Sequence, residues 1–240
     1  MFRKLLKKIF LTLSFPLRYL IWYELERQHS EFASQNLRRV LQRMASQSTA
    51  KYVYQHMWHV DSVTSPFDLL SLLDDADLSD GRLVCEFGVY TGTTINYMAA
   101  LTEHTIYGFD SFEGLPERWR DGIGAGSFKQ ATFPKVAPNV ALIKGWFHES
   151  LPPFLEEHDG DIAFLHIDSD IYSSAKTILN LLQKRIQPGC IIVFNEYFNY
   201  PGWEDGEYKA FQEFITETGK NYEYMSYNRI HEQVAVKIIE

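Results

Sequence analysis

Cysteine is scarce in this chain of 240 residues, which has only Cys85 and Cys190. Two cysteines cannot form the disulfide framework of a small secreted domain. Both lie within apolar runs that are typical of buried strands, where a thiol packs as a small hydrophobic side chain. We therefore expect two reduced core cysteines and a cytoplasmic protein.

Positive charge is also in short supply, with 23 lysines and arginines against 31 acidic residues and a formal net charge of −8. An acidic surface repels a phosphate backbone, so we expect no nucleic-acid partner. The first 23 residues differ from the rest, because they contain no acid. Their basic residues are Arg3, Lys4, Lys7, Lys8 and Arg18.

Long hydrophobic runs are missing as well. Crossing a bilayer takes about 20 apolar residues, and Pro16 and Arg18 interrupt the apolar start of the chain. No small-x-small cleavage site follows, which argues against a secretory signal. A basic amphipathic segment over residues 1–20 is typical of peripheral contact with an anionic membrane, here at the inner face. The alternative is that this segment packs on the main domain or on a second subunit of a homo-oligomer.

What the chain does contain is an alternation of strand-like and helical runs. Strands are expected at residues 83–87, 105–109, 140–144, 162–167, 190–194, 222–227 and 234–239, and helices at 66–73, 93–101, 173–186 and 206–218. This alternation predicts a doubly wound α/β fold with a mainly parallel sheet, and the closing hairpin adds an antiparallel strand. We expect three parts, namely the basic segment 1–23, a helical lid or dimerisation region 24–80 and the α/β domain 81–240.

The most informative stretch of the sequence begins at Leu83 and is expected to form a strand, a glycine-bearing turn and a helix. Gly88 and Gly92 have no Cβ, so the backbone there can turn and approach a ligand closely. Asp110 ends the next strand, where a carboxylate can accept hydrogen bonds from a ribose diol. The stretch predicts a pocket for a nucleotide-like ligand. The glycines at 122–126 neither follow a strand nor open a helix, so they predict a flexible loop over the site.

Acidic and amide side chains gather at the carboxyl ends of later strands, where ligands bind in an open α/β sheet. Asp168 and Asp170 follow one strand, and Asn195 and Glu196 follow the next along the chain. Oxygen ligands suit a hard cation such as Mg²⁺, and the candidates are Asp168, Asn195 and Glu196. Asp170 or His166, which alternate with Asp168 in extended backbone, can take the proton of a bound hydroxyl.

Four blocks of the sequence, taken in order, resemble the signature blocks of the macrocin O-methyltransferase family. They are Glu86-Phe-Gly-Val-Tyr-Thr-Gly92, Gly108-Phe-Asp-Ser-Phe-Glu-Gly-Leu-Pro116, Lys144-Gly-Trp-Phe-His-Glu-Ser-Leu-Pro152 and His166-Ile-Asp-Ser-Asp-Ile-Tyr172. The combination is specific, although each block alone is weak. The resemblance runs from about residue 60 to the C-terminus. It implies a Rossmann-like class I fold and methyl transfer from S-adenosylmethionine to a sugar hydroxyl.

The resemblance also implies roles for single residues. S-adenosylmethionine is expected to bind at Glu86, Gly88, Thr93, Asp110, Ser111 and Phe112. The Mg²⁺ ligands are expected at Asp168, Asn195 and Glu196, with Asp170 as the base. The family usually has an aspartate where this chain has Asn195, and an uncharged amide lowers the expected affinity for the cation.

The sequence thus predicts an S-adenosylmethionine-dependent O-methyltransferase that acts on a sugar or glycoconjugate, and three alternatives stay open. Tyr172 and Lys176 have the Tyr-x-x-x-Lys spacing of a class of nicotinamide-dependent sugar oxidoreductases, although the glycine turn lacks the three-glycine fingerprint. The segment Asp168-Ser-Asp170 resembles the metal motif of glycosyltransferases. The third alternative is a non-catalytic binding protein of the same fold.

Overall fold

The structure, a computed structural model, describes residues 15, 17–25, 27 and 36–239. The chain divides into two compact units, Met1–Met44 and Ala45–Glu240. In the first unit, the described residues from 15 to 27 are helical. Most of the basic segment that is predicted to contact a membrane lies outside the described residues. Among the helices that the structure describes, none is long and apolar enough to cross a membrane.

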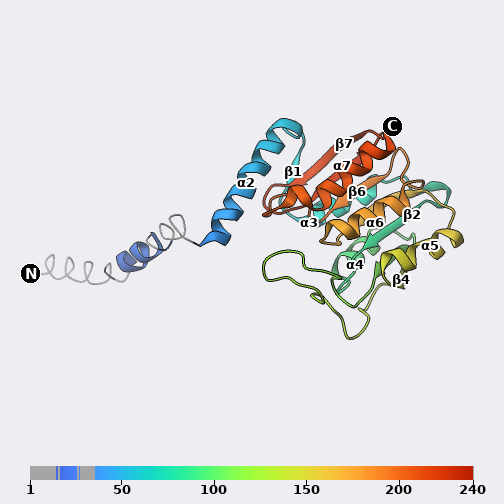
Figure 1. The fold of residues 1–240 in the computed structure, drawn as a ribbon, viewed down its shortest axis with the longest axis horizontal. Coiled ribbons are helices and arrows are strands. Elements are labelled where there is room, and N and C mark those ends of the chain that lie inside the picture. Colours follow the sequence, from blue (N-terminus) through green and yellow to red (C-terminus); the bar gives the residue numbers. More distant parts are fainter. Residues whose placement is uncertain (1–14, 16, 26, 28–35, 240) are drawn as a thin grey trace, which may run out of the picture. The chain divides into compact units, whose positions relative to one another are not determined.

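The second unit is built around one eight-stranded sheet with the order β1-β7-β8-β6-β5-β2-β3-β4 (Figure 1). The strands are β1 (Ser62–Val63), β2 (Leu83–Phe87), β3 (Ile106–Asp110), β4 (Val140–Lys144), β5 (Ile162–Ile167), β6 (Ile191–Phe194), β7 (Tyr222–Asn228) and β8 (Val234–Ile238). Strand β8 runs antiparallel to its neighbours β6 and β7, whereas the other described pairs are parallel. The predicted mainly parallel sheet with an antiparallel C-terminal strand is confirmed.

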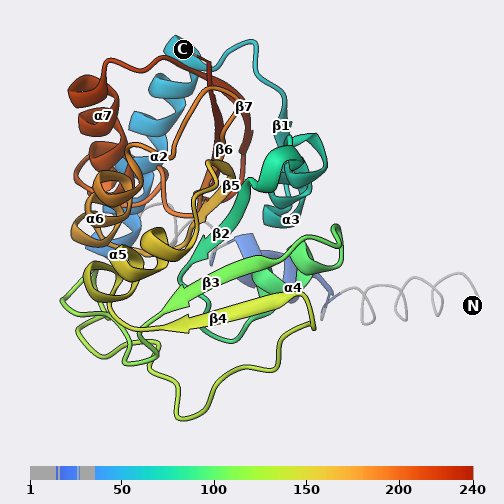
Figure 2. The same cartoon turned by 90° about the vertical axis from the view of Figure 1, so that its right-hand side faces the viewer.

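Helices cover both faces of this sheet (Figure 2). They are α2 (Leu37–His56), α3 (Pro66–Leu70), α4 (Thr93–Ala99), α5 (Phe147–Glu157), α6 (Tyr172–Leu182) and α7 (Glu207–Thr218), with 3₁₀ turns at Ser71–Asp75, Ser79–Gly81 and Trp203–Asp205. Helices α5, α6 and α7 share one core with the sheet, and α3 and α4 share the other. Alternation along the strands produces the two cores, since Val84 and Cys85 are adjacent on β2 and pack into different ones.

Local sequence signals account for several element boundaries. Ser65 caps α3 by accepting a hydrogen bond from the Phe67 N–H at 3.2 Å, and Pro66 opens the helix.

Helix α5 was not predicted, because Pro152 and Pro153 lie inside it and proline disfavours a helix interior. Packing overrides that cost, since α5 buries Leu151 and Phe154 against the sheet.

Both cysteines are free and buried, Cys85 on β2 and Cys190 directly before β6. Burial raises the pKa of both thiols, so they stay protonated and unreactive at neutral pH. The prediction of two unpaired core cysteines is confirmed.

Candidate functional site

The turn between β2 and α4 depends on Gly88. Its φ is +95°, and its N–H donates a hydrogen bond to the Phe109 carbonyl at 2.9 Å. A Cβ at this position would lie 1.8 Å from the backbone oxygen of Asp168. The carboxyl ends of β2 and β5 therefore come together only because residue 88 has no side chain.

Asp110, at the end of β3, holds this turn in place. Its Oδ2 accepts from the backbone N–H groups of Val89 and Tyr90, each at 2.9 Å, and its Oδ1 accepts from the Phe112 N–H at 2.7 Å. Tyr90 and Phe112 have positive φ angles of 46° and 58°, so the carboxylate stabilises a strained backbone. A carboxylate has about four lone-pair positions, which leaves room for a ligand hydroxyl as well. Sequence reasoning found Asp110 but missed this bracing role.

Glu86 and His166 form a buried pair on the neighbouring strands β2 and β5, where they are register partners. The His166 Nδ1 lies 2.8 Å from Glu86 Oε2, and the Thr94 hydroxyl donates to Glu86 Oε1 at 3.1 Å. Burial raises the pKa of Glu86, although its hydrogen bond with His166 opposes that shift. For His166, burial lowers the pKa, but the hydrogen bond and charge of Glu86 outweigh it and raise the pKa. The pair thus links the side chains of β2 and β5 beneath the turn.

A cavity of about 600 Å³ opens at the carboxyl ends of the strands. Its wall includes the predicted residues Gly88, Asp110, Ser111, Asp168, Asp170, Asn195 and Glu196, together with Tyr90, Trp119, Phe128, Trp146 and Phe147. The other predicted site residues are Glu86, Thr93, Phe112 and His166, and they are not part of this wall. The structure thus brings the glycine turn and the strand-end acids to one cavity of a size that suits small molecules.

Three carboxylates crowd together in this cavity. Oxygens of Asp168, Asp170 and Glu196 all lie within 4.8 Å of one another. Burial raises the pKa of Asp170 to about 8, with a further increase from the charge of Asp168 and an opposing effect from Arg120. Burial and the neighbouring acids raise the pKa of Glu196 well above its usual range. Asp170 also has a positive φ of 65°, a strain of the kind that collects at functional sites.

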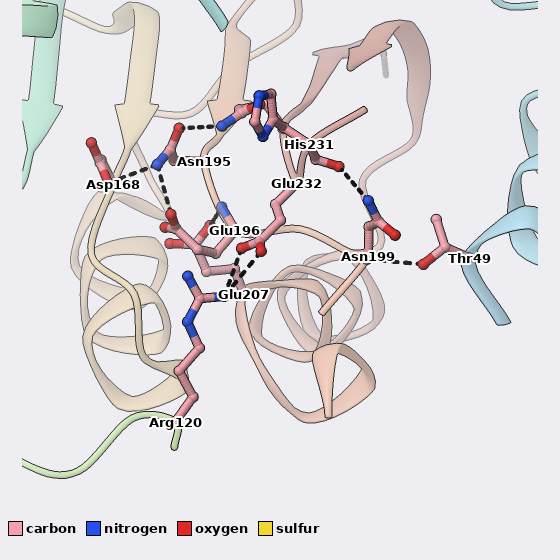
Figure 3. Close-up of polar contacts among 10 residues, drawn as sticks. Thr49, Arg120, Asp168, Asn195, Glu196, Asn199, Glu207, His231 and Glu232 are labelled. Carbon is pink, nitrogen blue, oxygen red and sulfur yellow. Dashed lines mark hydrogen bonds and ion pairs between the residues drawn. The ribbon is translucent and has the colours of Figure 1, made fainter. Parts of the chain in front are cut away.

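Asn195 lies between two of these acids (Figure 3). Its Nδ2 donates to Asp168 Oδ1 at 3.0 Å and to Glu196 Oε1 at 2.6 Å. The carboxylates of Asp168, Asp170 and Glu196 fit the oxygen chemistry of the predicted Mg²⁺, and Glu196 Oε2 is buried without a partner. Asn195 does not fit a ligand role in this orientation, because an amide NH₂ group has no lone pair to offer a metal.

Sequence reasoning missed two charged residues near the acids, namely Glu207, which binds the backbone of the acid-bearing loops, and Arg120, which pairs with Glu232. Glu207, the first residue of α7, accepts from the backbone N–H of Glu196 at 3.0 Å and of Ser169 at 3.4 Å. Arg120 donates to both carboxylate oxygens of Glu232 at 3.0 Å, which ties the connection 111–139 to the β7–β8 turn (Figure 3). No sequence motif marks either contact, since each joins segments far apart in the chain.

The Tyr172 and Lys176 spacing has a structural explanation. The Tyr172 hydroxyl donates to Glu213 at 2.7 Å, and Lys176 pairs with Glu213 and Glu217. Both side chains thus link α6 to α7, and neither belongs to the cavity wall. The feature that favoured an oxidoreductase is a contact between two helices.

Comparison with known proteins agrees with this architecture. Residues 85–197 match a protein family described as "Methyltransferase domain". A curated relative from Streptomyces olivaceus, "8-demethyl-8-(2,3-dimethoxy-alpha-L-rhamnosyl)-tetracenomycin-C 4'-O-methyltransferase", is 29% identical over 51% of this chain and 55% of its own length. A second, the "Demethyldecarbamoylnovobiocin O-methyltransferase" of Streptomyces niveus, is 26% identical over 54% of this chain and 58% of its own. The matches therefore span just over half of each curated relative.

Solved structures share the fold. The calicheamicin methyltransferase CalS11 superposes with a TM-score of 0.56 at 23% sequence identity, covering 71% of this chain and 76% of that one. At this identity the likeness concerns the fold alone. It confirms the predicted Rossmann-like class I fold, and residues 85–197 of that fold are similar to the methyltransferase-domain family.

Two glycines with similar backbone angles test the contact at Gly88. Gly88→Ala introduces both a left-handed alanine and a clash with Asp168, so we expect the free energy of unfolding to fall by about 3 kcal/mol or more. Gly202 has a φ of +85° and nothing within 4 Å of an added Cβ, so Gly202→Ala should cost only about 1–2 kcal/mol. Urea denaturation measures both values. Equal losses would show that the clash is absent.

Proposed function

We propose that this chain is an S-adenosylmethionine-dependent O-methyltransferase, because residues 85–197 match a family described as "Methyltransferase domain" and the chain has the class I fold. Its acceptor is a hydroxyl of a sugar or glycoconjugate. The acceptor class is supported by the printed name of the Streptomyces olivaceus relative, which describes methylation of a rhamnosyl tetracenomycin. One observation carries the proposal, namely that a single cavity joins the Gly88 turn to the Asp168 and Asp170 carboxylates.

The cofactor occupies the half of the cavity beside the glycine turn. Gly88, Asp110 and Ser111 line it and are proposed as direct contacts, with Asp110 reaching the ribose hydroxyls. Glu86, Thr93 and Phe112 are proposed to support the cofactor by shaping the turn behind them. The sulfonium of S-adenosylmethionine is cationic, so the surrounding carboxylates favour its binding.

Asp170 is the proposed base, and His166 is not, because His166 is buried in its pair with Glu86. S-adenosylmethionine would supply the methyl group, the acceptor oxygen would take it as the carbon–sulfur bond breaks, and Asp170 would accept the hydroxyl proton. Products are a methyl ether and S-adenosylhomocysteine. Alignment of the two substrates supplies much of the acceleration. A pKa of about 8 places Asp170 near the value that suits a general base at neutral pH.

The acceptor half of the cavity is formed by the connection 111–139. Trp119, Ile123 and Phe128 contribute apolar wall from this segment, which matches the apolar faces of a sugar ring. The Arg120–Glu232 ion pair fixes the segment to the body of the protein. We propose that this connection, with the helical region 24–80, selects the acceptor.

A peripheral contact with the inner membrane face is a further part of the proposal. The described helical residues from 15 to 25 expose large apolar side chains, including Phe15 at 71%, Leu20 at 60% and Trp22 at 56%. Aromatic residues of this kind prefer the interfacial region of a bilayer. Residues 1–23 carry five basic residues and no acid, whereas the remaining chain is strongly acidic. The basic start therefore offers the charge that an anionic surface attracts.

Calorimetry tests the cofactor and separates the alternatives. We expect S-adenosylhomocysteine to bind with a measurable heat, and NAD⁺ and a nucleotide sugar with Mn²⁺ to give none under the same conditions. Binding of NAD⁺ without S-adenosylhomocysteine would favour an oxidoreductase. Binding of the nucleotide sugar alone would favour a glycosyltransferase that uses Asp168-Ser-Asp170. Heat from none of the three would favour a non-catalytic protein.

The role of Asp170 is tested by Asp170→Asn. An amide cannot accept the proton, so we expect methyl transfer to fall about 100-fold or more, with binding of S-adenosylhomocysteine retained. A radiolabelled methyl donor measures transfer, and calorimetry measures binding. Asp75→Asn, at an exposed position, is the matched control and should leave both unchanged. Full transfer by Asp170→Asn would refute the assignment.

Vesicle flotation tests the membrane contact. We expect the full chain to float with vesicles that contain phosphatidylglycerol and to stay unbound with pure phosphatidylcholine. The variant with Lys4, Lys7 and Lys8 changed to Glu should remain unbound, since each lost cation removes about 1 kcal/mol of attraction at the surface. Equal flotation of both proteins would contradict the proposal, and a change of oligomeric state in the variant would point to packing between subunits instead.

A further inference from the structure

The orientation of Asn195 is set by a chain of amides that starts at a backbone group. The Ile230 N–H donates to Asn228 Oδ1 at 3.1 Å. The Asn228 Nδ2 then donates to Gln233 Oε1 at 3.0 Å, and the Gln233 Nε2 donates to Asn195 Oδ1 at 3.0 Å. A backbone N–H can only donate, so each amide in the chain has only one orientation that satisfies its neighbours. We call Asn228, Gln233 and Asn195 the amide relay.

The relay turns the NH₂ group of Asn195 toward the acids and its oxygen away from them. The NH₂ group of Asn195 then donates one hydrogen bond to an oxygen of Asp168 and one to an oxygen of Glu196. Both ends of this network are buried, with Asn228 1% exposed and Glu196 6% exposed, so a partner lost there is not replaced by water; Asn195 and Gln233 between them are half-buried. An amide in this orientation supplies the positive end of a dipole at a place where a ligated cation would otherwise balance the two carboxylates.

We propose that the amide relay replaces a divalent cation in this protein. Asn195 is a positioning residue that holds Asp168 and Glu196 through its two N–H groups, and methyl transfer proceeds without Mg²⁺. This inference rests on the proposed methyltransferase function for its catalytic part, whereas the weak cation affinity follows from the relay alone. Gln233 determines the orientation of the Asn195 amide, since its Nε2 donates to the Asn195 oxygen and keeps that oxygen away from the acids.

Cation binding tests the relay without any need for activity. The probe is Mn²⁺, whose free concentration is read by electron paramagnetic resonance during titration of the full chain. We expect weak binding by the wild type and at least about ten-fold tighter binding by Asn195→Asp, which restores a charged oxygen ligand. Comparable affinities for the two proteins would overturn the proposal.

Gln233→Glu tests the orientation directly. A carboxylate at 233 can only accept, so Asn195 must turn its NH₂ group toward it and present its oxygen to the acids. We expect Mn²⁺ binding to tighten about ten-fold. The added charge alone is measured by placing Gln233→Glu on the Asn195→Asp background, where orientation no longer matters and the gain should be smaller. Gln183→Glu, an exposed site, controls for net charge. An equal gain on both backgrounds would refute the relay.

Methyl transfer completes the test. We expect the wild-type rate to be unchanged by EDTA or by added Mg²⁺. Loss of transfer in EDTA with recovery in Mg²⁺ would overturn the proposal even if Mn²⁺ binding is weak. If no acceptor is methylated under any condition, the proposed function fails, but the Mn²⁺ titrations still decide whether the amide relay excludes the cation.

Discussion

The contact between Gly88 and the backbone of Asp168 is the constraint on which the site depends. It joins the carboxyl ends of β2 and β5 so closely that only a hydrogen atom fits on the Cα of residue 88. The turn that follows Gly88 is held by Asp110, and Asp170 lies two residues after Asp168. The turn and the acids thereby line one cavity. In the proposed function the turn holds the methyl donor and the acids face the acceptor, and proximity of this kind is what a transfer reaction needs.

That closeness concentrates negative charge, and the protein offsets it with hydrogen-bond donors. Glu207 accepts hydrogen bonds from backbone N–H groups of the two loops that carry the acids. Glu232 forms an ion pair with Arg120. Asn195 donates to Asp168 and Glu196. Burying carboxylates is costly unless each is paired or protonated, and burial accordingly raises the pKa values of Asp170 and Glu196. A cationic cofactor in the cavity would lower this cost further.

The sequence alone is sufficient to predict whatever depends on local pattern. Strands β2, β4 and β5 have the expected boundaries. Strands β2 and β5 are buried parallel strands with nearly continuous apolar runs, and the half-buried edge strand β4 is apolar up to Lys144. The position of Asp168 directly after β5 follows from those boundaries. Helix α5 was missed, since its prolines oppose a helix and only the packing of Leu151 and Phe154 explains it. The amide relay was also missed, because no spacing rule connects positions 195, 228 and 233.

The antiparallel strand β8 explains why the relay can exist. Since β8 runs against β6, it begins where β6 ends, and Phe194 is paired with Val234. The turn between β7 and β8 therefore lies at the carboxyl edge of the sheet, beside Asn195. A parallel strand in this position would begin at the opposite edge. The same turn supplies Gln233 to Asn195 and Glu232 to Arg120, so one hairpin orients the amide beside the acids and anchors the connection 111–139.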